Sequence, residues 1–580
     1  MRRLIPFFMC LVCASCASQP RPAASTPAAT AAPQAPALTP PSWDSYIDQL
    51  IEGYLASHPS FAVRQGRHEF DGRLPDWSPA GLQEQLTWLD AQREKLAHFA
   101  PESLSEEQRF QRDYVRANLD SEVFFLRELR VAARSPMYYL GAGLDPSVYV
   151  NTPYAPIAKR AEAFIAYLEK VPTAVAQMRA NLELPLPRTF VDYSVVSFTG
   201  MAEFYRKDAL LAFAEATDPA LQSRLRAAVE PAARAMSEVS SWFGAQTNFS
   251  EQGYVLGTER FKAMLEQTEG VTTALEELEA IGRADLQRNL DALAAACIKY
   301  APKASLQSCV DKLNRDKPKG GAVEGARAQL SELRSFVVER EIVSISGTEE
   351  AKVAEAPAYQ RQNFAYIDIP GPYENNLPSV YYIAPPDPRW SKAEQDAYVP
   401  GKADLLFTSV HEVWPGHFLQ FLHSNRASWR FGQLFVGYAF AEGWAHYAEE
   451  LVVEEGLADN APDLQIGQIS NALLRNVRFL CAIGLHTQGL TVAQCEQMFK
   501  DQAYQDVGNA RQQASRGTYD PAYLNYTMGK LMIRKLRADW KAENPGRPLR
   551  EFHDAFLAHG GPPIPLLRAR LLKDPSGSLF

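Results

Sequence analysis

Two histidines and a glutamate stand close together in the segment LLFTSVHEVWPGHFLQ. His411 is followed directly by Glu412, and His417 comes six residues after His411. Zinc peptidases use this set of side chains, because two imidazoles hold the metal and the glutamate acts as general base toward the attacking water. We therefore predict that His411 and His417 bind Zn²⁺ and that Glu412 is the catalytic base.

The spacing of the two histidines differs from that of the regular helical zinc motif, HExxH. On an ideal helix, a separation of six residues turns the second side chain by roughly 240° from the first, so the imidazoles point apart. Pro415 and Gly416 lie between them, however. Proline removes a helical hydrogen bond, and glycine permits unusual backbone angles. We expect a kink or bulge at this pair that brings His417 back toward His411.

A second segment, AFAEGWAHYAEE, supplies a carboxylate. Glu442 lies 25 residues after His417, which leaves room for a helix, a turn and a returning helix, so we predict Glu442 as the third metal ligand. His446 follows at the i+4 position on the same helical face, either as a further ligand or as a hydrogen-bonding partner of Glu442. Glu449 and Glu450 are expected on a solvated face.

Candidates for other roles lie further along the chain. Tyr526 is predicted to donate to the oxyanion that forms when water attacks an amide, a contact worth a few kcal/mol. Tyr523 is a second candidate, and the alternative is that both tyrosines pack in the last helical layer. Arg478 and Arg537 could bind a substrate carboxylate with two hydrogen bonds. His486 is predicted in the catalytic cleft, with a hydrogen-bonded core histidine as the alternative.

The segments HEVWPGHFLQ and EGWAHYAEEL resemble those of the DUF885 family, bacterial proteins placed near the gluzincin-type zinc metallopeptidases. The likeness extends over most of the chain, through segments that begin at His58, Gly66, Arg478, Asp520 and Phe552. This resemblance implies a mostly helical, cleft-bearing fold and a zinc hydrolase, and it supplies no substrate. Ala482 departs from the family pattern, which has an acidic residue before Gly484, so a contact to His486 is missing or made elsewhere.

The N-terminus has the pattern of an export signal. Arg2 and Arg3 precede a short apolar run, and small residues lead from that run to Cys16. We predict a signal of the lipoprotein type, with Cys16 as the lipidated residue. Because Cys13 stands where an aliphatic residue is usual, a plain secretory signal is the alternative.

The predicted organisation has three parts. Residues 1–15 form the signal, residues 16–41 form a Pro/Ala-rich tether, and residues 42–580 form the helical catalytic domain. The protein is then exported and attached by lipid to the bacterial cell envelope, on the outer membrane facing the periplasm. Its partners are a peptide substrate and the membrane that holds the anchor.

Four cysteines remain after the signal and the lipidation site: Cys297, Cys309, Cys481 and Cys495. An even number in an oxidising compartment favours disulfides. Of the three possible connectivities, the simplest pairs Cys297 with Cys309 and Cys481 with Cys495. None of these four cysteines has CxxC spacing, so a cysteine zinc site is not expected.

The rest of the chain is largely helical in pattern, with apolar residues recurring every three or four positions. Long helices are predicted over 83–97, 105–130, 157–181, 219–245 and 271–295, with breaks or kinks at Pro172 and Pro231. Residues 364–369 and 378–383 predict an antiparallel β-ribbon, along which a peptide could align. We expect a mainly α, large two-lobed, zincin-like helical fold with this ribbon beside a central cleft.

Composition limits the class of protein. The chain of 580 residues has a net charge of −9, with 46% hydrophobic and 22% charged residues, an ordinary globular balance. The acidity argues against nucleic-acid binding, and no P-loop, dinucleotide fingerprint or GxSxG motif occurs. We predict a zinc-dependent metallopeptidase. Two alternatives stay open: a zinc amidase acting on cell-envelope material, and a catalytically silent, envelope-anchored binding lipoprotein.

Overall fold

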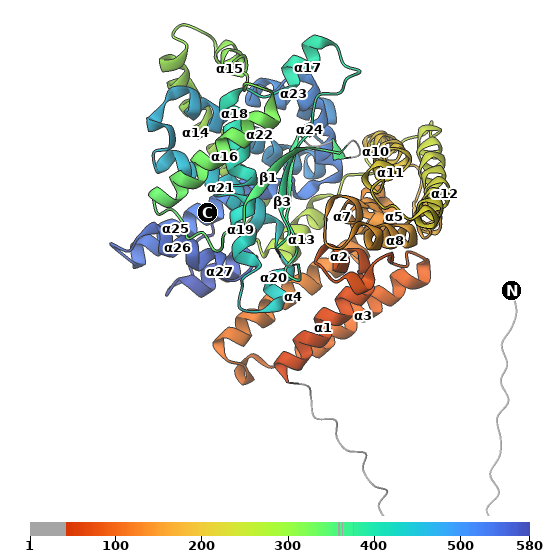
Figure 1. Ribbon diagram of the computed structural model, residues 1–580. Helices are drawn as coiled ribbons and strands as arrows, with labels where there is room; N and C mark the ends of the chain where they lie inside the picture. The colour runs from red at the N-terminus through yellow and green to blue at the C-terminus, as the bar shows by residue number, and fades with distance from the viewer. Residues whose placement is uncertain (1–41, 358–359, 362–363, 375) are drawn as a thin grey trace, which may run out of the picture.

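The computed structural model describes residues 42–357, 360–361, 364–374 and 376–580. The predicted signal, the tether and the lipidated Cys16 therefore lie outside the described residues. The chain is predominantly helical around one small sheet (Figure 1), which confirms the mainly α fold class. Within this part of the chain, no helix is long and apolar enough to cross a membrane.

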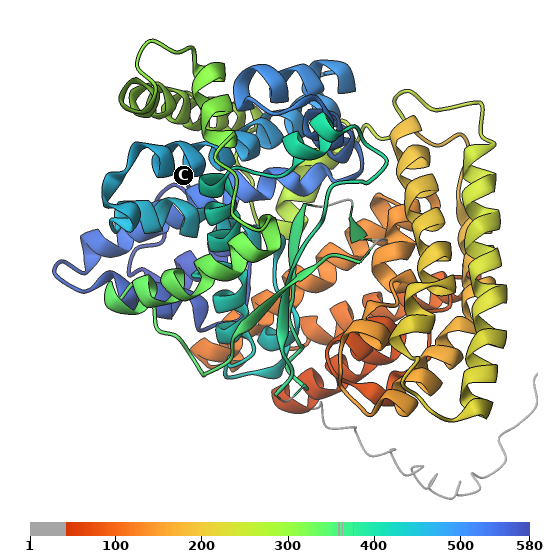
Figure 2. The ribbon, with the colours of Figure 1, turned by 45° about the horizontal axis from the view of Figure 1, so that its top comes forward.

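The first half of the chain builds one side of the molecule. Figure 2 shows its yellow helices standing side by side at one edge, and α12 packs on α8, α9 and α10. The helices of this half are α1 (Trp43–Ser57), α2 (Pro59–Arg64), α3 (Pro79–Ala97), α4 (Glu106–Val123), α5 (Val131–Arg134), α6 (Pro136–Tyr139), α7 (Ser147–Asn151), α8 (Ile157–Leu168), α9 (Val171–Asn181), α10 (Arg188–Arg206), α11 (Asp208–Ala212) and α12 (Pro219–Gly244).

The second half of the chain, green to blue in Figure 2, lies across the sheet from those helices and gives the fold its two lobes. At its centre α22 contacts α14, α18, α23, α24 and α25. Its helices are α13 (Thr258–Glu269), α14 (Leu275–Tyr300), α15 (Leu306–Asn314), α16 (Ala322–Glu339), α17 (Lys392–Tyr398), α18 (Lys402–Glu412), α19 (His417–Ser424), α20 (Arg430–Leu434), α21 (Tyr438–Glu454), α22 (Pro462–Thr487), α23 (Val492–Ala503), α24 (Val507–Tyr519), α25 (Asn525–Glu543), α26 (Leu549–Leu557) and α27 (Ile564–Leu571).

The sheet has three strands among the described residues: β1 (Ala351–Glu355), β2 (Ala365–Asp368) and β3 (Ser379–Ile383). The predicted ribbon is present, because β2 and β3 pair in antiparallel fashion with Tyr366 opposite Tyr382. The unpredicted strand β1 pairs in parallel with β3, so the sheet is mixed. Its sequence, AKVAE, has a single β-branched residue and gave no strand signal. In the order β1-β3-β2, strand β2 lies at an edge.

Two predicted long helices are divided. Pro172 lies in the first turn of α9, where its missing N–H has no helical partner, and the chain breaks between α8 and α9. The helix predicted over 105–130 passes into a π-helical segment, Phe124–Glu128. Pro231, by contrast, lies inside α12 without ending it.

Both neighbouring cysteine pairs are bonded. Cys297 joins Cys309 and thereby links α14 to α15, and Cys481 joins Cys495 and links α22 to α23. Each bond closes a short loop, of 12 and 14 residues in sequence separation. By restricting the unfolded chain, a loop of this length contributes about 3 kcal/mol to stability.

Two glycines let α21 and α25 cross in backbone contact. A Cβ on Gly443 would lie 2.5 Å from the Cα of Gly529, and a Cβ on Gly529 would lie 2.1 Å from the carbonyl oxygen of Ala439. Glu442 stands next to Gly443 on α21, and Tyr526 lies one turn before Gly529 on α25. The close crossing therefore brings two of the predicted site residues toward each other.

We expect Gly443→Ala to lower the free energy of unfolding by about 1–3 kcal/mol, because the added methyl group overpacks the crossing. Alanine favours a helix over glycine by about 1 kcal/mol, so the same change at an open helical site should not destabilise. Gly244→Ala, in α12, is that control, since its Cβ would meet only one side-chain atom, at 3.9 Å. The measurement is the midpoint of urea denaturation, and equal midpoints for the two variants would contradict the packing argument.

Candidate metal centre

The two predicted histidine ligands lie on different helices, because α18 ends at Glu412 and α19 begins at His417. In the turn between them, the Gly416 N–H donates to the Val410 carbonyl at 3.0 Å. A Cβ on Gly416 would lie 1.9 Å from the carbonyl oxygen of His411, so no side chain fits there. The helix is thus interrupted completely, rather than kinked as predicted, and restarts with His417 facing His411.

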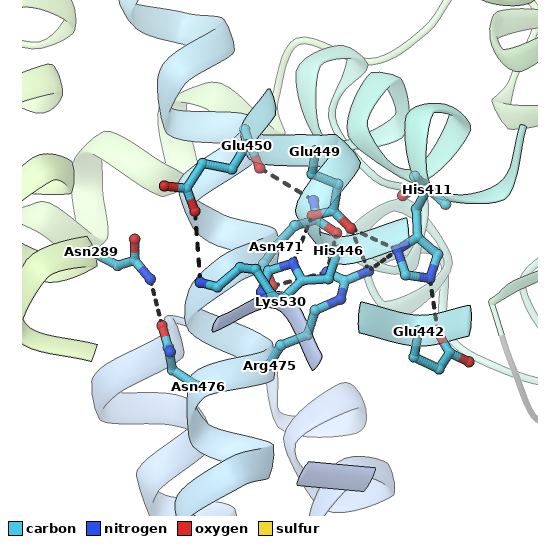
Figure 3. A network of polar contacts seen from close by, with 12 residues as sticks. Asn289, His411, Glu442, His446, Glu449, Glu450, Asn471, Arg475, Asn476 and Lys530 are labelled. Atoms are coloured by element: carbon cyan, nitrogen blue, oxygen red, sulfur yellow. Dashed lines mark hydrogen bonds and ion pairs between the residues drawn. The ribbon is translucent and has the colours of Figure 1, made fainter. Parts of the chain in front are cut away.

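A buried hydrogen bond ties this turn to α21, where Trp444 Nε1 donates to the Pro415 carbonyl at 2.8 Å. Glu442 on α21 then meets both imidazoles. Its Oε2 lies 3.2 Å from His411 Nε2 and 3.2 Å from His417 Nε2. Figure 3 draws the contact with His411 as a dashed line. The ligand atoms of the three residues all lie within 4.8 Å of one another. They form the one group among the described residues that could hold a metal ion through His, Cys, Asp or Glu.

Behind His411 lies Glu449, whose predicted place on a solvated face is wrong. Glu449 is fully buried, and its Oε1 accepts a hydrogen bond from His411 Nδ1 at 2.7 Å (Figure 3). The same oxygen lies 3.0 Å from Arg475 Nη2. Because Glu449 engages Nδ1, the Nε2 atom of His411 is left to face the site.

The burial of Glu449 beside the centre could have been predicted from the sequence, but the place of Arg475 could not. Glu449 follows Glu442 by seven residues, or two helical turns, so both carboxylates lie on one face of α21. Arg475 lies on α22, far along the chain, and no spacing within a helix points to it.

Burial and ion pairing set the charges at the site. Burial raises the pKa of Glu442, but the two imidazoles hold this pKa well below its usual range. Burial likewise raises the pKa of Glu449, and Arg475 and His411 more than reverse the effect. Burial and Arg475 lower the pKa of His411, yet the two carboxylates bring it to about 9. Both carboxylates are therefore ionised beside the imidazoles.

His446 lies beside Glu449 rather than Glu442. Its Nδ1 is 3.5 Å from Glu449 Oε2, and neither ring nitrogen has a hydrogen-bond partner within the described chain. Burial, together with Lys530, lowers the pKa of His446 to about 4, so the ring is neutral. His446 is not part of the cluster that could hold an ion.

Glu412 and Tyr526 both line a cavity of about 1070 Å³ that opens onto the three candidate ligands. Glu412 is only 8% exposed, and burial raises its pKa against the opposing effect of His411 and His417. The Tyr526 ring lies 6.0 Å from the His411 ring. Burial also raises the pKa of Tyr526, so its hydroxyl keeps its proton and can donate.

Three other candidates are absent from the cavity lining. His486 is fully buried and donates to the Gly517 carbonyl at 2.8 Å, so the structure corrects its predicted place from the cleft to the core. The Gly517 carbonyl is thus the hydrogen-bond partner of His486, since Ala482 has no acidic side chain to offer. Tyr523 is fully buried in the core. Arg537 pairs with the carboxylate of Glu454, the last residue of α21, at 2.7 Å.

Comparison with known proteins places the chain in a family. The family model "Bacterial protein of unknown function (DUF885)" matches residues 59–571, so the chain belongs to the DUF885 family. No protein of curated function matches the chain.

Solved structures share the fold. A predicted lipoprotein of unknown function from Shewanella oneidensis is 24% identical, with a TM-score of 0.74 over 92% of this chain and 100% of its own. A predicted lipoprotein from Colwellia psychrerythraea is 18% identical, with a TM-score of 0.73 over 90% of this chain and 98% of its own. A carboxypeptidase from Pyrococcus furiosus is 10% identical over 90% of this chain and 95% of its own, but its TM-score of 0.31 supports no argument.

If the centre binds zinc as the sequence predicts, Glu449→Gln should weaken that binding by about 10–100-fold, the usual effect of removing the partner that orients a histidine ligand. The loss follows because glutamine carries no charge to stabilise a metal-bound imidazole or Arg475. Competition with a chromogenic chelator measures the affinity.

Glu450→Gln is the matched control. Glu450 is also buried, but it pairs with Arg288 at 2.9 Å and Arg534 at 2.8 Å rather than with the site. Its variant should keep the affinity of the unmodified protein. Equal losses in both variants would assign the effect to general destabilisation.

Proposed function

We propose that this protein is a zinc-dependent hydrolase, and most specifically a metallopeptidase. The observation that carries the proposal is the convergence of His411, His417 and Glu442, whose ligand atoms lie within 4.8 Å of one another. They come from three helices, and a turn without room for a side chain directs the two histidines toward each other.

The donor set fits zinc. Two imidazoles and one carboxylate are the ligands of many catalytic zinc sites, which keep a further position open. His411 is oriented by Glu449, as metal-bound histidines commonly are by a carboxylate. Bound there, zinc would supply a Lewis acid that polarises a carbonyl and lowers the pKa of water.

The chain's own residues provide the remaining parts of a hydrolytic mechanism. Glu412 lines the cavity beside the ligands, and its carboxylate can take a proton from the attacking water and pass it to the leaving nitrogen. The Tyr526 hydroxyl can donate to the developing oxyanion. Both groups are buried, and burial strengthens such electrostatic contacts.

A peptide substrate is supported by the edge strand β2. Residues of β2 line the same cavity as His411, and β2 has a free edge in the three-stranded sheet. An extended peptide can add to such an edge through main-chain hydrogen bonds. The cavity is also large enough for several residues of substrate, since ordinary ligand pockets have volumes of about 300–1,000 Å³.

Glu412→Gln tests the proposed base. The variant should keep its zinc, because Glu412 is not a ligand, but lose roughly 10²–10⁴-fold in kcat on a peptide library. Glu454→Gln, at an exposed position of α21, should keep full activity. Zinc content is measured by atomic absorption, and substantial turnover by Glu412→Gln would reject this residue as the base.

The same assays separate the two alternatives. Cleavage of cell-wall muropeptides but not of ordinary peptides would identify a zinc amidase. A purified protein with neither stoichiometric zinc nor activity on either substrate panel would identify a silent binding protein.

We also propose that Cys16 is lipidated and holds the protein at the cell envelope. The two structural relatives described as predicted lipoproteins support this, together with the pattern before Cys16. Labelling with a radioactive fatty acid should mark the full-length chain and not its Cys16→Ser variant.

A further inference from the structure

Three arginines surround the ring of Tyr526 in the cavity wall. Arg475 and Arg478 come from α22, and Arg516 comes from α24. Their guanidinium carbons lie 5.7, 4.7 and 5.7 Å from the ring centre, in that order. All three also line the cavity that contains the candidate metal ligands.

Two of the three arginines have a carboxylate partner. Arg475 Nη2 lies 3.0 Å from Glu449, and Arg516 Nη2 lies 2.9 Å from Asp520. Arg478 has none among the described residues. Its Nε donates to Gln513 Oε1 at 2.8 Å, which leaves both Nη groups available to the cavity.

An unpaired cation at this depth is unfavourable. Arg478 is only 7% exposed, and burial, with Arg516 and Arg475 nearby, lowers its pKa. A buried charge normally has a partner of opposite sign. Two acidic groups that line the same cavity are already engaged, since Glu442 meets the two imidazoles and Asp404 accepts from the Asn471 amide.

The position of Arg478 relates the missing anion to the metal centre. Arg478 lies 4.7 Å from the Tyr526 ring, which in turn lies 6.0 Å from the His411 ring. Successive residues of a peptide are spaced by about 3.8 Å. An anionic group on Arg478 is therefore within a few residues of a bond held at the centre.

We propose that Arg478 binds the C-terminal carboxylate of the substrate, so that the protein removes short segments from the C-terminal end of peptides. The inference rests on the proposed hydrolase function. Because Gln513 holds Nε, the two Nη groups are free to form a bidentate pair with a carboxylate. The Tyr526 ring fixes the guanidinium by a cation–π contact at 4.7 Å.

The test compares an N-acetylated peptide of neutral residues in two forms, with a free C-terminus and with a C-terminal amide. A charged hydrogen-bonded pair predicts a preference of roughly 10–100-fold in kcat/KM for the free acid. In Arg478→Gln the ratio of acid to amide should fall to about one, and in Arg478→Lys it should be intermediate. Arg511→Gln, an exposed arginine on α24, should keep the full ratio.

A third peptide distinguishes the source of the carboxylate. It ends in a glutamate amide, so its negative charge is on a side chain. Cleavage of this peptide as efficient as that of the free acid would overturn the assignment to the C-terminus. A kcat/KM for this peptide as low as that for the neutral amide supports the assignment.

Failure of the inference and failure of the hydrolase function give different results. Equal hydrolysis of acid and amide by the unmodified protein would leave a hydrolase but overturn the role of Arg478. If no peptide is cleaved, isothermal titration calorimetry with the zinc-loaded protein measures the binding of the acid and amide peptides and so still tests the role of Arg478. Tighter binding of the acid, lost in Arg478→Gln, supports the anion site without hydrolysis, and equal or absent binding overturns it.

Discussion

The centre depends on one contact between backbone atoms. Gly416 lies against the carbonyl of His411 with no space for a Cβ, and its N–H bonds the last turn of α18. The indole of Trp444 holds the neighbouring Pro415 carbonyl. The backbone positions from which His411 and His417 project are therefore set by this turn, and the hydrogen bond to Glu449 then orients the His411 ring. Preorganisation of this kind means that little reordering is needed when a ligand binds.

A chain of buried charges extends from that contact into the core. Figure 3 shows Glu442, His411, Glu449 and Arg475 in sequence, each in contact with the next. Burying charges is favourable only where partners replace water, and every member of this chain has one. Arg478 departs from the rule on the same helix as Arg475. The departure distinguishes this part of the cavity wall from the paired charges behind the centre.

The sequence predicts which residues come together at the candidate centre better than how the backbone brings them there. His411, Glu412, His417 and Glu442 follow from residue types and spacing, although ideal helical geometry argued against the two histidines meeting. The interruption at Pro415 and Gly416 resolves that conflict, and its completeness depends on contacts that no local pattern encodes. Long helices were also predictable, because their period is local.

What could not be predicted depends on partners distant in sequence. Strand β1 forms only because β3 offers a parallel edge, and its own residues favour no strand. His486 was misassigned to the cleft because its partner is the backbone carbonyl of Gly517, which leaves no trace in the residue types. Glu449 was wrongly assigned to a solvated face although the sequence contained the relevant pattern. Its spacing of seven residues from Glu442 places both carboxylates on the same, inward face of α21.

Because of the disulfide between Cys481 and Cys495, the structure of the cavity wall depends on the redox state of the compartment. Cys481 lies one turn beyond Arg478 on α22, so the bridge fastens the arginine-bearing helix to α23. A chain made in a reducing cytosol would lack this clamp. Recombinant production in an oxidising compartment is therefore the appropriate starting point for measuring any property of the cavity, and material refolded without oxidant would report on a looser molecule.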